Sequence, residues 1–442
     1  MLRTLSLVLM LAAPAFAQEV EVPVFAFPDS AYRIGDVLIV GNDLTKRYVI
    51  EQEMGLKRDS LLTHAAASYD LNRIYGLKLF TKVTFDAAPV SDDVATLIVT
   101  VQERWYFYPF PVLGIKDRDF SRLYYGAGVV HNNVGGRNTQ AFASFAAGYD
   151  PYVMLNYVNP LVDIERRIFF SARAYYTEQR NRSLVAKAGA PNFDEHRAGG
   201  IVTLGKRYSL FSLVSVSLEY LNIHVSDDRA GRTLSPTGRD EFYSLHTGYV
   251  YDTRDLREYP AEGTFASFSV SKHGLLEETV DYQRVNVDLR RYVPLSGGST
   301  VAGRAFTSLA GGGRIPNYGH VFFGYAERIR GHFNEIEEGE QIAGTTAELH
   351  VPLVSPRYLR LGFMPVEEFR DLRYALYAAA FADAGAVWYR DEPLALNTVR
   401  SGYGLGLHFH LAYSAVARFE FGFPWGRPLS EGQIILDLGA AL

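Results

Sequence analysis

The 442-residue sequence contains no cysteine, which excludes disulfide frameworks, thiol catalysis and cysteine-ligated metal sites. It also lacks a charge imbalance, because 44 Lys and Arg stand against 49 Asp and Glu, a formal net charge of −5. That balance does not indicate a nucleic-acid partner. The 11 histidines are scattered, with His408 and His410 only a weak pair, so we expect no metal and no cofactor.

Long hydrophobic runs are also missing, since no stretch beyond the first residues approaches the ~18 unbroken apolar residues of a membrane-spanning helix. The first residues have Arg3, a short apolar core and an A-x-A site at Ala15–Ala17, which predicts a signal peptide over 1–17. Residues 18–31 are expected to be a linker. An exported chain of this kind enters a membrane only as a closed barrel, because open strands leave backbone groups unsatisfied in lipid.

Residues 32–103 predict a small α+β domain of order β-α-α-β-β. A strand is expected at 34–40, helices at 45–54 and 59–75 with Asp59 as N-cap and Gly76 as terminator, and strands at 79–85 and 95–101. With "LIVGN" and "LIVTVQER" in place, this order resembles a POTRA domain. The resemblance implies a periplasmic domain that binds unfolded client proteins, often by strand addition. An unrelated α/β domain is the alternative.

Residues 104–442 consist of segments in which apolar and polar or small residues alternate. In "GYGLGLHFHL", for example, Leu405, Leu407 and Phe409 lie on one face, and His408 and His410 on the other. A soluble sandwich also alternates and can place its charges on one face, but the signal peptide, the single continuous run of such segments and the aromatic-rich strand ends favour a transmembrane barrel with a polar lumen. About sixteen antiparallel strands are expected, near 105–115, 121–131, 139–149, 151–159, 166–178, 196–207, 211–224, 241–252, 262–274, 279–292, 299–311, 341–351, 373–389, 400–411, 413–423 and 432–442.

A long charged loop at 312–341 precedes two strands whose polar faces carry acids. Parity directs Glu348 and Asp383 into the lumen, and the loop carries Arg330. A guanidinium can bridge two carboxylates with bidentate hydrogen bonds, so Arg330 would attach an inward-folded loop to the wall. Spacing alone favours the plainer interpretation that all three are ordinary solvated charges.

Several motifs resemble the BamA/TamA superfamily of outer-membrane barrels: "IRGH" in the loop, "ELHVP" in the next strand and "FADAG" in the strand after that, together with "HNNVGGRN", "YVNP" and "YDTRDLREYPAEG". The resemblance covers the mature chain. It implies that the loop arginine enters the lumen and binds the strand acids. The residues carried over by position are Arg330, Gly331, Glu348, Phe381, Asp383 and Gly385.

The sequence departs from the family pattern at three points. His332 follows Arg-Gly where the family usually has Phe or Tyr, and Leu442 ends the chain in place of Phe or Trp. A single POTRA-like domain argues against the central assembly factor itself. His332 is where this member is expected to differ.

The superfamily inserts or translocates proteins, and the resemblance implies a lateral seam between the first and last strands. Pro109 and Pro111 lack a ladder donor and weaken that pairing, and Gly439, three residues before Leu442, matches a kinking glycine. The expected location is a Gram-negative outer membrane, with the POTRA-like domain in the periplasm. Expected partners are outer-membrane lipids, unfolded outer-membrane or secreted clients, and a periplasmic or lipoprotein accessory.

Two rival functions stay open at this point: a dedicated secretion pore for one passenger encoded by a neighbouring gene, and a passive porin-like channel. An enzyme is not expected, because His224 and Ser226 have no recognisable acid partner or oxyanion glycine pattern.

Overall fold

The alternating segments of residues 104–442 form one antiparallel sheet, which confirms the predicted all-β class. A computed structural model describes residues 17–20, 27, 29, 32–115, 122–187, 192–226, 229, 231–276, 279–364, 370–411 and 415–439. The sheet has 17 strands, of which β1 (Ala17–Val20) is an addition that pairs with β19. The sixteen barrel strands are β6 (Phe107–Ile115), β7 (Leu123–Val134), β8 (Thr139–Gly148), β9 (Tyr152–Asp163), β10 (Ile168–Arg180), β11 (Asp194–Arg207), β12 (Ser212–Val225), β13 (Arg239–Asp252), β14 (Gly263–Leu275), β15 (Tyr282–Pro294), β16 (Thr300–Gly312), β19 (Gln341–Leu361), β20 (Asp371–Trp388), β21 (Arg400–Leu411), β22 (Ala415–Pro424) and β23 (Gln433–Gly439).

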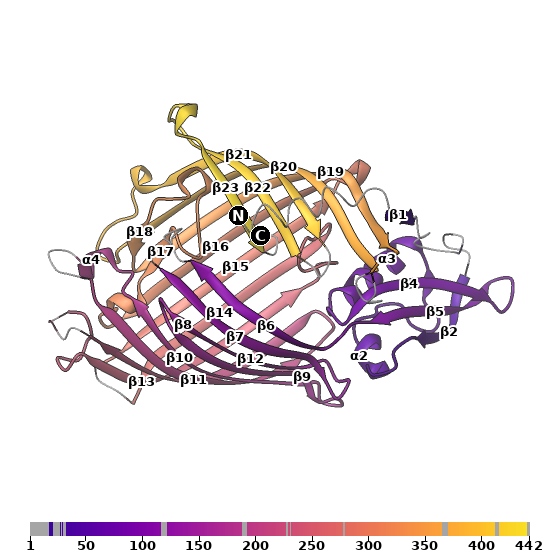
Figure 1. Ribbon diagram of the computed structural model, residues 1–442, viewed down its shortest axis with the longest axis horizontal. Helices are drawn as coiled ribbons and strands as arrows, with labels where there is room; N and C mark the ends of the chain where they lie inside the picture. Colours follow the sequence, from indigo (N-terminus) through magenta and orange to yellow (C-terminus); the bar gives the residue numbers. More distant parts are fainter. Residues whose placement is uncertain are drawn as a thin grey trace.

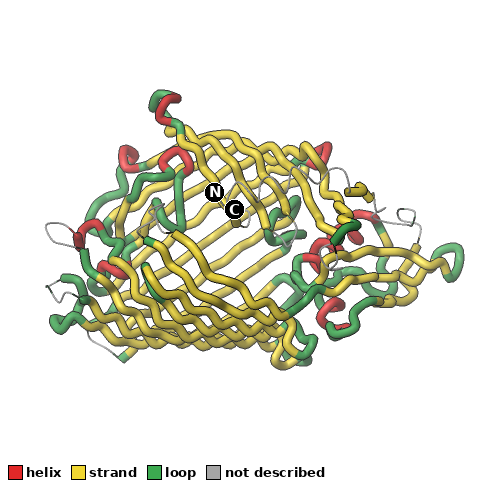
Figure 2. The backbone as a smooth tube through the Cα atoms, viewed as in Figure 1, coloured by secondary structure: helices red, strands yellow, loops and turns green. Residues whose placement is uncertain are grey.

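The two faces of the barrel wall follow the parity of the sequence, because successive side chains of a strand point to opposite faces. On β21, Leu405 is 64% exposed on the outer surface, whereas His408 is fully buried inside. Figure 1 shows the strands curled around a lumen, and Figure 2 shows loops and short helices gathered at the ends of the strands. Strand β19 is longer than the predicted 341–351 and continues past Pro352 to Leu361.

The N-terminal domain is a four-stranded sheet of order β3-β2-β5-β4. Its two helices and its hydrophobic core lie together against this sheet. Among the described residues, no helix is long and apolar enough to cross a lipid bilayer. The elements of the domain are β2 (Tyr32–Val40), α2 (Arg47–Glu51), β3 (Leu61–Leu62), α3 (His64–Tyr75), β4 (Phe80–Pro89) and β5 (Val94–Glu103).

The predicted start of the second helix at Asp59 is wrong. Asp59 has a positive φ of 69°, and β3, just after it, pairs with the start of β2. The helix begins instead after Thr63, whose side chain accepts a hydrogen bond from the Ala66 backbone N–H. The predicted end at Gly76 is confirmed, and the first helix is shorter than the predicted 45–54.

Buried ion pairs and an apolar contact dock this domain onto one end of the barrel (Figure 1). Glu53 accepts from Arg73 of α3 at 2.6 Å and from Arg207 of β11 at 3.3 Å, so one carboxylate joins both parts. Leu256, in the turn between β13 and β14, belongs to the hydrophobic core of the N-terminal domain. The domain is therefore held by the barrel through charge and through shared core.

Candidate functional site

The loop between β16 and β19 folds against the inner wall of the barrel. It contains two short strands, β17 (Val321–Phe323) and β18 (Glu337–Gly339), and a 3-10 turn, η3 (Arg330–His332). Phe323 and Ile329 of the loop are buried with Ile342 of β19 in a small hydrophobic cluster. The loop is attached by apolar contact as well as by its charges.

Arg330 meets three carboxylates at the inner wall. Its Nε and Nη2 donate to the two oxygens of Asp383, both at 2.8 Å, and its backbone N–H donates to Asp383 Oδ2 at 3.1 Å. Its Nη1 donates to Glu420 at 2.9 Å and pairs with Glu348. The arginine side chain is 12% exposed and the carboxylates at most 5%. The structure thus brings together Arg330, Glu348 and Asp383, which the sequence had singled out.

The other residues carried over by resemblance surround this cluster. The Arg330 guanidinium carbon lies 3.6 Å from the ring centroid of Phe381, a cation–π contact. At Gly331, a Cβ atom would come within 2.6 Å of the Phe423 carbonyl oxygen, so only glycine lets the loop backbone lie on the wall. At Gly385, a Cβ atom would meet the Phe323 ring at 2.5 Å. Both glycines make room for the attached loop.

His332, the departure from the family pattern, is buried in the turn η3. Its Nδ1 lies 3.0 Å from a Glu335 carboxylate oxygen, and that carboxylate also pairs with Arg427 at 3.3 Å. The aromatic contact comes from the next residue, because the Arg328 guanidinium carbon lies 4.2 Å from the Phe333 ring centroid. In this chain a histidine beside a carboxylate therefore takes the place next to Arg-Gly, and the aromatic ring follows it at the next position.

Sequence reasoning missed the third carboxylate, Glu420, and two histidines that hydrogen-bond to the acids of the cluster. Glu420 of β22 lies on the polar face of its strand, but nothing in its spacing tied it to the loop. His408 Nε2 lies 3.1 Å from Glu420, and His350 Nε2 lies 2.7 Å from Glu348. A buried carboxylate accepts several hydrogen bonds, so each of these acids is held from both sides.

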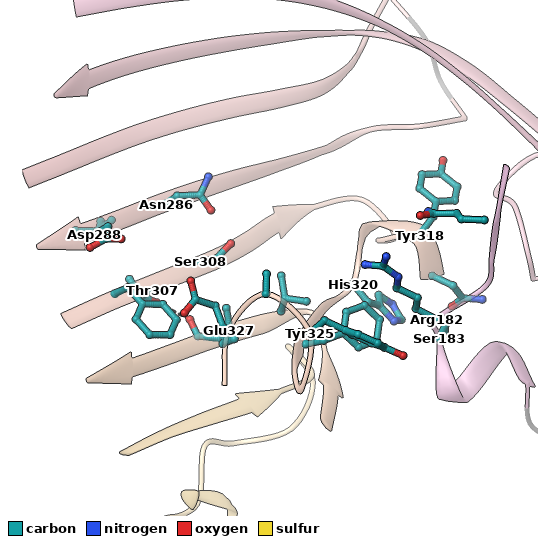
Figure 3. Close-up of a pocket in the computed structure, with 18 of the residues that line it drawn as sticks. Arg182, Ser183, Asn286, Asp288, Thr307, Ser308, Tyr318, His320, Tyr325 and Glu327 are labelled. Atoms are coloured by element: carbon teal, nitrogen blue, oxygen red, sulfur yellow. Dashed lines mark hydrogen bonds between the residues drawn. The ribbon is translucent and has the colours of Figure 1, made fainter. Parts of the chain in front are cut away.

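A second cluster attaches the loop to the strands β15 and β16. Arg304 of β16 donates to Glu327 of the loop at 2.8 and 2.9 Å and to Asp288 of β15 at 3.0 Å. Asp288 is shared with Arg290 at 2.7 Å. Figure 3 shows Asp288 and Glu327 at one end of a cavity of about 470 Å³ that lies between loop and wall. No pattern in the sequence indicated this cluster.

The outer part of the loop is attached through Glu338. Its carboxylate accepts from Ser183 Oγ and from the Leu184 backbone N–H, both at 2.5 Å, and lies 2.6 Å from His320 Nδ1. Ser183 immediately precedes the short helix α4 (Leu184–Lys187), and Figure 3 shows Ser183 and His320 close together. Burial alone would raise the pKa of Glu338, but the hydrogen bonds outweigh it and the pKa is lowered.

The first and last barrel strands, β6 and β23, are neighbours in the strand order, and Figure 1 shows them facing each other across a gap at the front of the barrel. Every other pair of neighbouring barrel strands has a defined residue register, but none is defined for β6 with β23 among the described residues. The Asn132 N–H donates to the Tyr106 carbonyl at 2.8 Å, and the β6–β7 register continues unbroken from there. Hydrogen-bonded residues alternate along an antiparallel pair. Pro109 and Pro111 are therefore at positions whose missing N–H would point toward β23.

A second cavity, of about 980 Å³, lies in the lumen beside the Arg330 cluster and reaches the last strand. Its lining includes Arg330 and Asp383, and also Leu436 and Asp437 of β23. Gly439 pairs with Val416 at the end of β23, and Leu442 lies outside the described residues, as do residues 1–16 of the predicted signal peptide. Within the described ranges, no group of three or more His, Cys, Asp or Glu is placed to hold a metal ion.

Comparisons with known proteins agree with this architecture. A family model described as the Omp85 superfamily domain matches residues 133–434, and a POTRA model, described as a surface antigen variable number repeat, matches residues 32–104. Among solved structures, the chain is similar to BamA from Haemophilus ducreyi lacking POTRA domains 1–3, at 18% identity and a TM-score of 0.54, covering 92% of this chain and 83% of that one. It is also similar to CdiB from Escherichia coli, at 11% identity and a TM-score of 0.57, covering 93% and 76%.

Proposed function

Because this chain belongs to the Omp85 superfamily of outer-membrane insertases and translocators, with its barrel in the Gram-negative outer membrane and its POTRA domain in the periplasm, we propose that it moves client proteins through a lateral seam between β6 and β23. Clients would be met by the POTRA domain, and the parted strands would offer free edges for a client strand.

The observation that carries this proposal is the edge of β6. An intact barrel satisfies its backbone by closing every strand pair. Here two of the donors that would close the last pair are absent, because Pro109 and Pro111 stand at positions directed toward β23. The missing donors make this pair the weakest in the ring.

The Arg330 cluster has a supporting role in this scheme. A barrel whose seam parts needs another element to keep the remaining wall in one shape. Through Arg330, the loop joins β19, β20 and β22, three strands on the β23 side of the seam. We propose that this attachment works as a lock, which keeps the loop and the wall together while the seam moves.

Cysteine cross-linking tests the seam directly, since the chain has no thiol of its own. Pro111→Cys is combined in turn with Ile434→Cys, Leu436→Cys or Leu438→Cys, all of which place thiols on the outer surface. Oxidation of the pair that reacts should abolish client handling, and reduction should restore it. The matched control is Ala127→Cys with Phe145→Cys, which bridges the paired strands β7 and β8 and should leave handling intact.

Proteomics of the outer membrane and of the medium provides the readout in cells that contain only the cross-linked protein. A fall in many outer-membrane proteins indicates general insertion, and loss of one secreted protein indicates the dedicated pore. Unchanged proteomes with a fully cross-linked seam would overturn the proposal. A passive porin would instead give a steady conductance in planar bilayers that the cross-link does not change.

A further inference from the structure

The turn between β13 and β14, residues 253–262, is buried between the POTRA domain and the lumen. Of residues 255–260, only Arg257 is exposed. Asp255 closes the turn on itself, because its Oδ1 accepts from the backbone N–H groups of Ala261 at 2.9 Å and Glu262 at 3.2 Å. A connecting turn is normally a surface feature, so a turn this deeply buried and internally bonded indicates a stiff connecting element.

One side of this turn is held by the POTRA domain. Leu256 packs in the POTRA core. Tyr69 of α3 donates to the Thr253 carbonyl at 2.8 Å, and Asn72, one helical turn later, donates to Asp255 at 3.3 Å. A displacement of α3 therefore acts on the turn through apolar contact and through hydrogen bonds.

The other side of the turn reaches into the lumen through Tyr259, three residues after Leu256. The Tyr259 ring stacks on His350 with centroids 4.8 Å apart and an angle of 26°, and it lies 4.6 Å from the Tyr377 ring. Its hydroxyl lies 3.1 Å from His408 Nδ1. The tyrosine thus contacts both histidines that stand behind the Arg330 cluster.

The direction of the hydrogen bonds follows from the chemistry of the groups. A carboxylate only accepts, so His408 Nε2 carries the proton that it donates to Glu420. In the neutral imidazole, Nδ1 is then the acceptor for the Tyr259 hydroxyl. Glu420 therefore sets the tautomer of the neutral His408 ring, and Tyr259 holds the orientation of that ring from its other nitrogen, as an outer partner does for a metal-bound histidine. His350 is oriented by stacking, and it donates to Glu348.

We propose that this turn couples the POTRA domain to the loop lock, with Tyr259 as the positioning residue. The coupling rests on the proposed function, in which the POTRA domain meets the client. When a client displaces α3, the turn withdraws Tyr259, His350 and His408 lose their orientation, and Glu348 and Glu420 hold Arg330 less tightly. Client engagement in the periplasm would in this way loosen the loop inside the barrel lumen.

The readout is loop release in the purified full-length protein, without any client, so its result does not depend on the seam experiment. Ile329→Cys places a single thiol where the attached loop buries it. The rate at which this thiol reacts with a maleimide reports loop release. It is measured only on protein that migrates as a folded barrel on a non-heated gel, which removes misfolded molecules from the comparison.

A double-mutant cycle separates coupling from general loosening. Tyr69→Phe with Asn72→Ala weakens the POTRA side of the turn, and Tyr259→Phe removes only the hydroxyl at the lumen side. The POTRA-side variant should speed labelling roughly tenfold when Tyr259 is intact and add little in the Tyr259→Phe background. The matched control is Tyr282→Phe, because Tyr282 is also a buried tyrosine stacked on a histidine, His273, at 4.4 Å.

In the Tyr282→Phe background the POTRA-side variant should keep its full effect. An equal acceleration with and without the Tyr259 hydroxyl would overturn the role of Tyr259. No acceleration in either background would overturn the coupling itself. If labelling behaves as expected while the cross-linked seam leaves client handling unchanged, the coupling stands and the proposed function fails.

Discussion

The loop is attached to the lumen wall by two arginine clusters of opposite construction. In the first, the loop supplies the cation, Arg330, and the wall supplies three carboxylates. In the second, the wall supplies the cation, Arg304, and the loop supplies a carboxylate, Glu327. The side chains of the first cluster are at most 12% exposed, whereas Glu327 of the second is 33% exposed.

The difference in charge balance shows which cluster the loop depends on. One arginine against three carboxylates leaves the first cluster with an excess of negative charge, and the hydrogen bonds from Arg330 and from the two histidines stabilise these acids. In the second cluster, Asp288 keeps Arg290 as a partner if Arg304 is lost. Removing one member of a buried ion pair is far more costly than removing a partner that water can replace.

The largest effect is expected for Arg330→Ala. It leaves three buried carboxylates facing one another, which costs roughly 3–5 kcal/mol of loop attachment, while the strand ladders and hence the inserted barrel persist. Thiol labelling at Ile329→Cys measures the release. Arg330→Lys keeps the charge but loses the bidentate bonds to Asp383, so an intermediate rate is expected. A slow, native-like rate in Arg330→Ala would show that apolar contacts alone hold the loop.

A direct exchange of partners sharpens the same point. Arg330→Asp is expected to behave at least as badly as Arg330→Ala, because it adds a fourth carboxylate. Combining it with Asp383→Arg returns one cation to the cluster and should recover part of the attachment, measured by the same labelling rate. Absence of any recovery would argue against direct pairing of these two residues as the source of the attachment.

Arg304→Ala should have a smaller effect, about 1 kcal/mol, since its loop partner Glu327 is one-third exposed and its wall partner keeps Arg290. Its salt dependence provides a second measurement. Added salt should loosen the loop through the partly exposed Arg304–Glu327 pair and have less effect through the more deeply buried Arg330 cluster. Equal labelling rates for Arg304→Ala and Arg330→Ala would contradict the charge-balance argument.

The two clusters also differ in how far the sequence predicts them. Parity along single strands, together with the family motifs, singled out Glu348, Asp383 and Arg330, because facing direction is a local property of a strand. The same parity puts Glu420 on the polar face of β22, but its approach to Arg330 depends on the curvature of the barrel across β20, β21 and β22. The Arg304–Glu327 pair depends on the path of a loop with no periodicity, so no local pattern reports it.

The POTRA domain shows the same limit on a smaller scale. Its order of elements follows from apolar periodicity, but the start of α3 was misplaced because Asp59 is a plausible N-cap by type. The short pairing of β3 with β2 competes for residues 61–62, and it is a contact between distant segments. The burial of Leu256 in the POTRA core and of Tyr259 in the lumen likewise arises from the docking of two parts of the chain.

The smallest effect is expected for Glu420→Gln, which removes a negative charge from the Arg330 cluster instead of the positive one. The amide oxygen can accept from Arg330 Nη1 and His408 Nε2 as the carboxylate does, while the excess negative charge of the cluster falls by one. The free energy of loop attachment should therefore change by at most about 1 kcal/mol, and the change can favour the attached state. Asp383→Asn is the matched control, because it disrupts the bidentate pair and should release the loop measurably faster. If thiol labelling of Glu420→Gln were as fast as that of Arg330→Ala, all three carboxylate charges would be needed to hold the loop. The excess negative charge would then stabilise the attachment instead of opposing it.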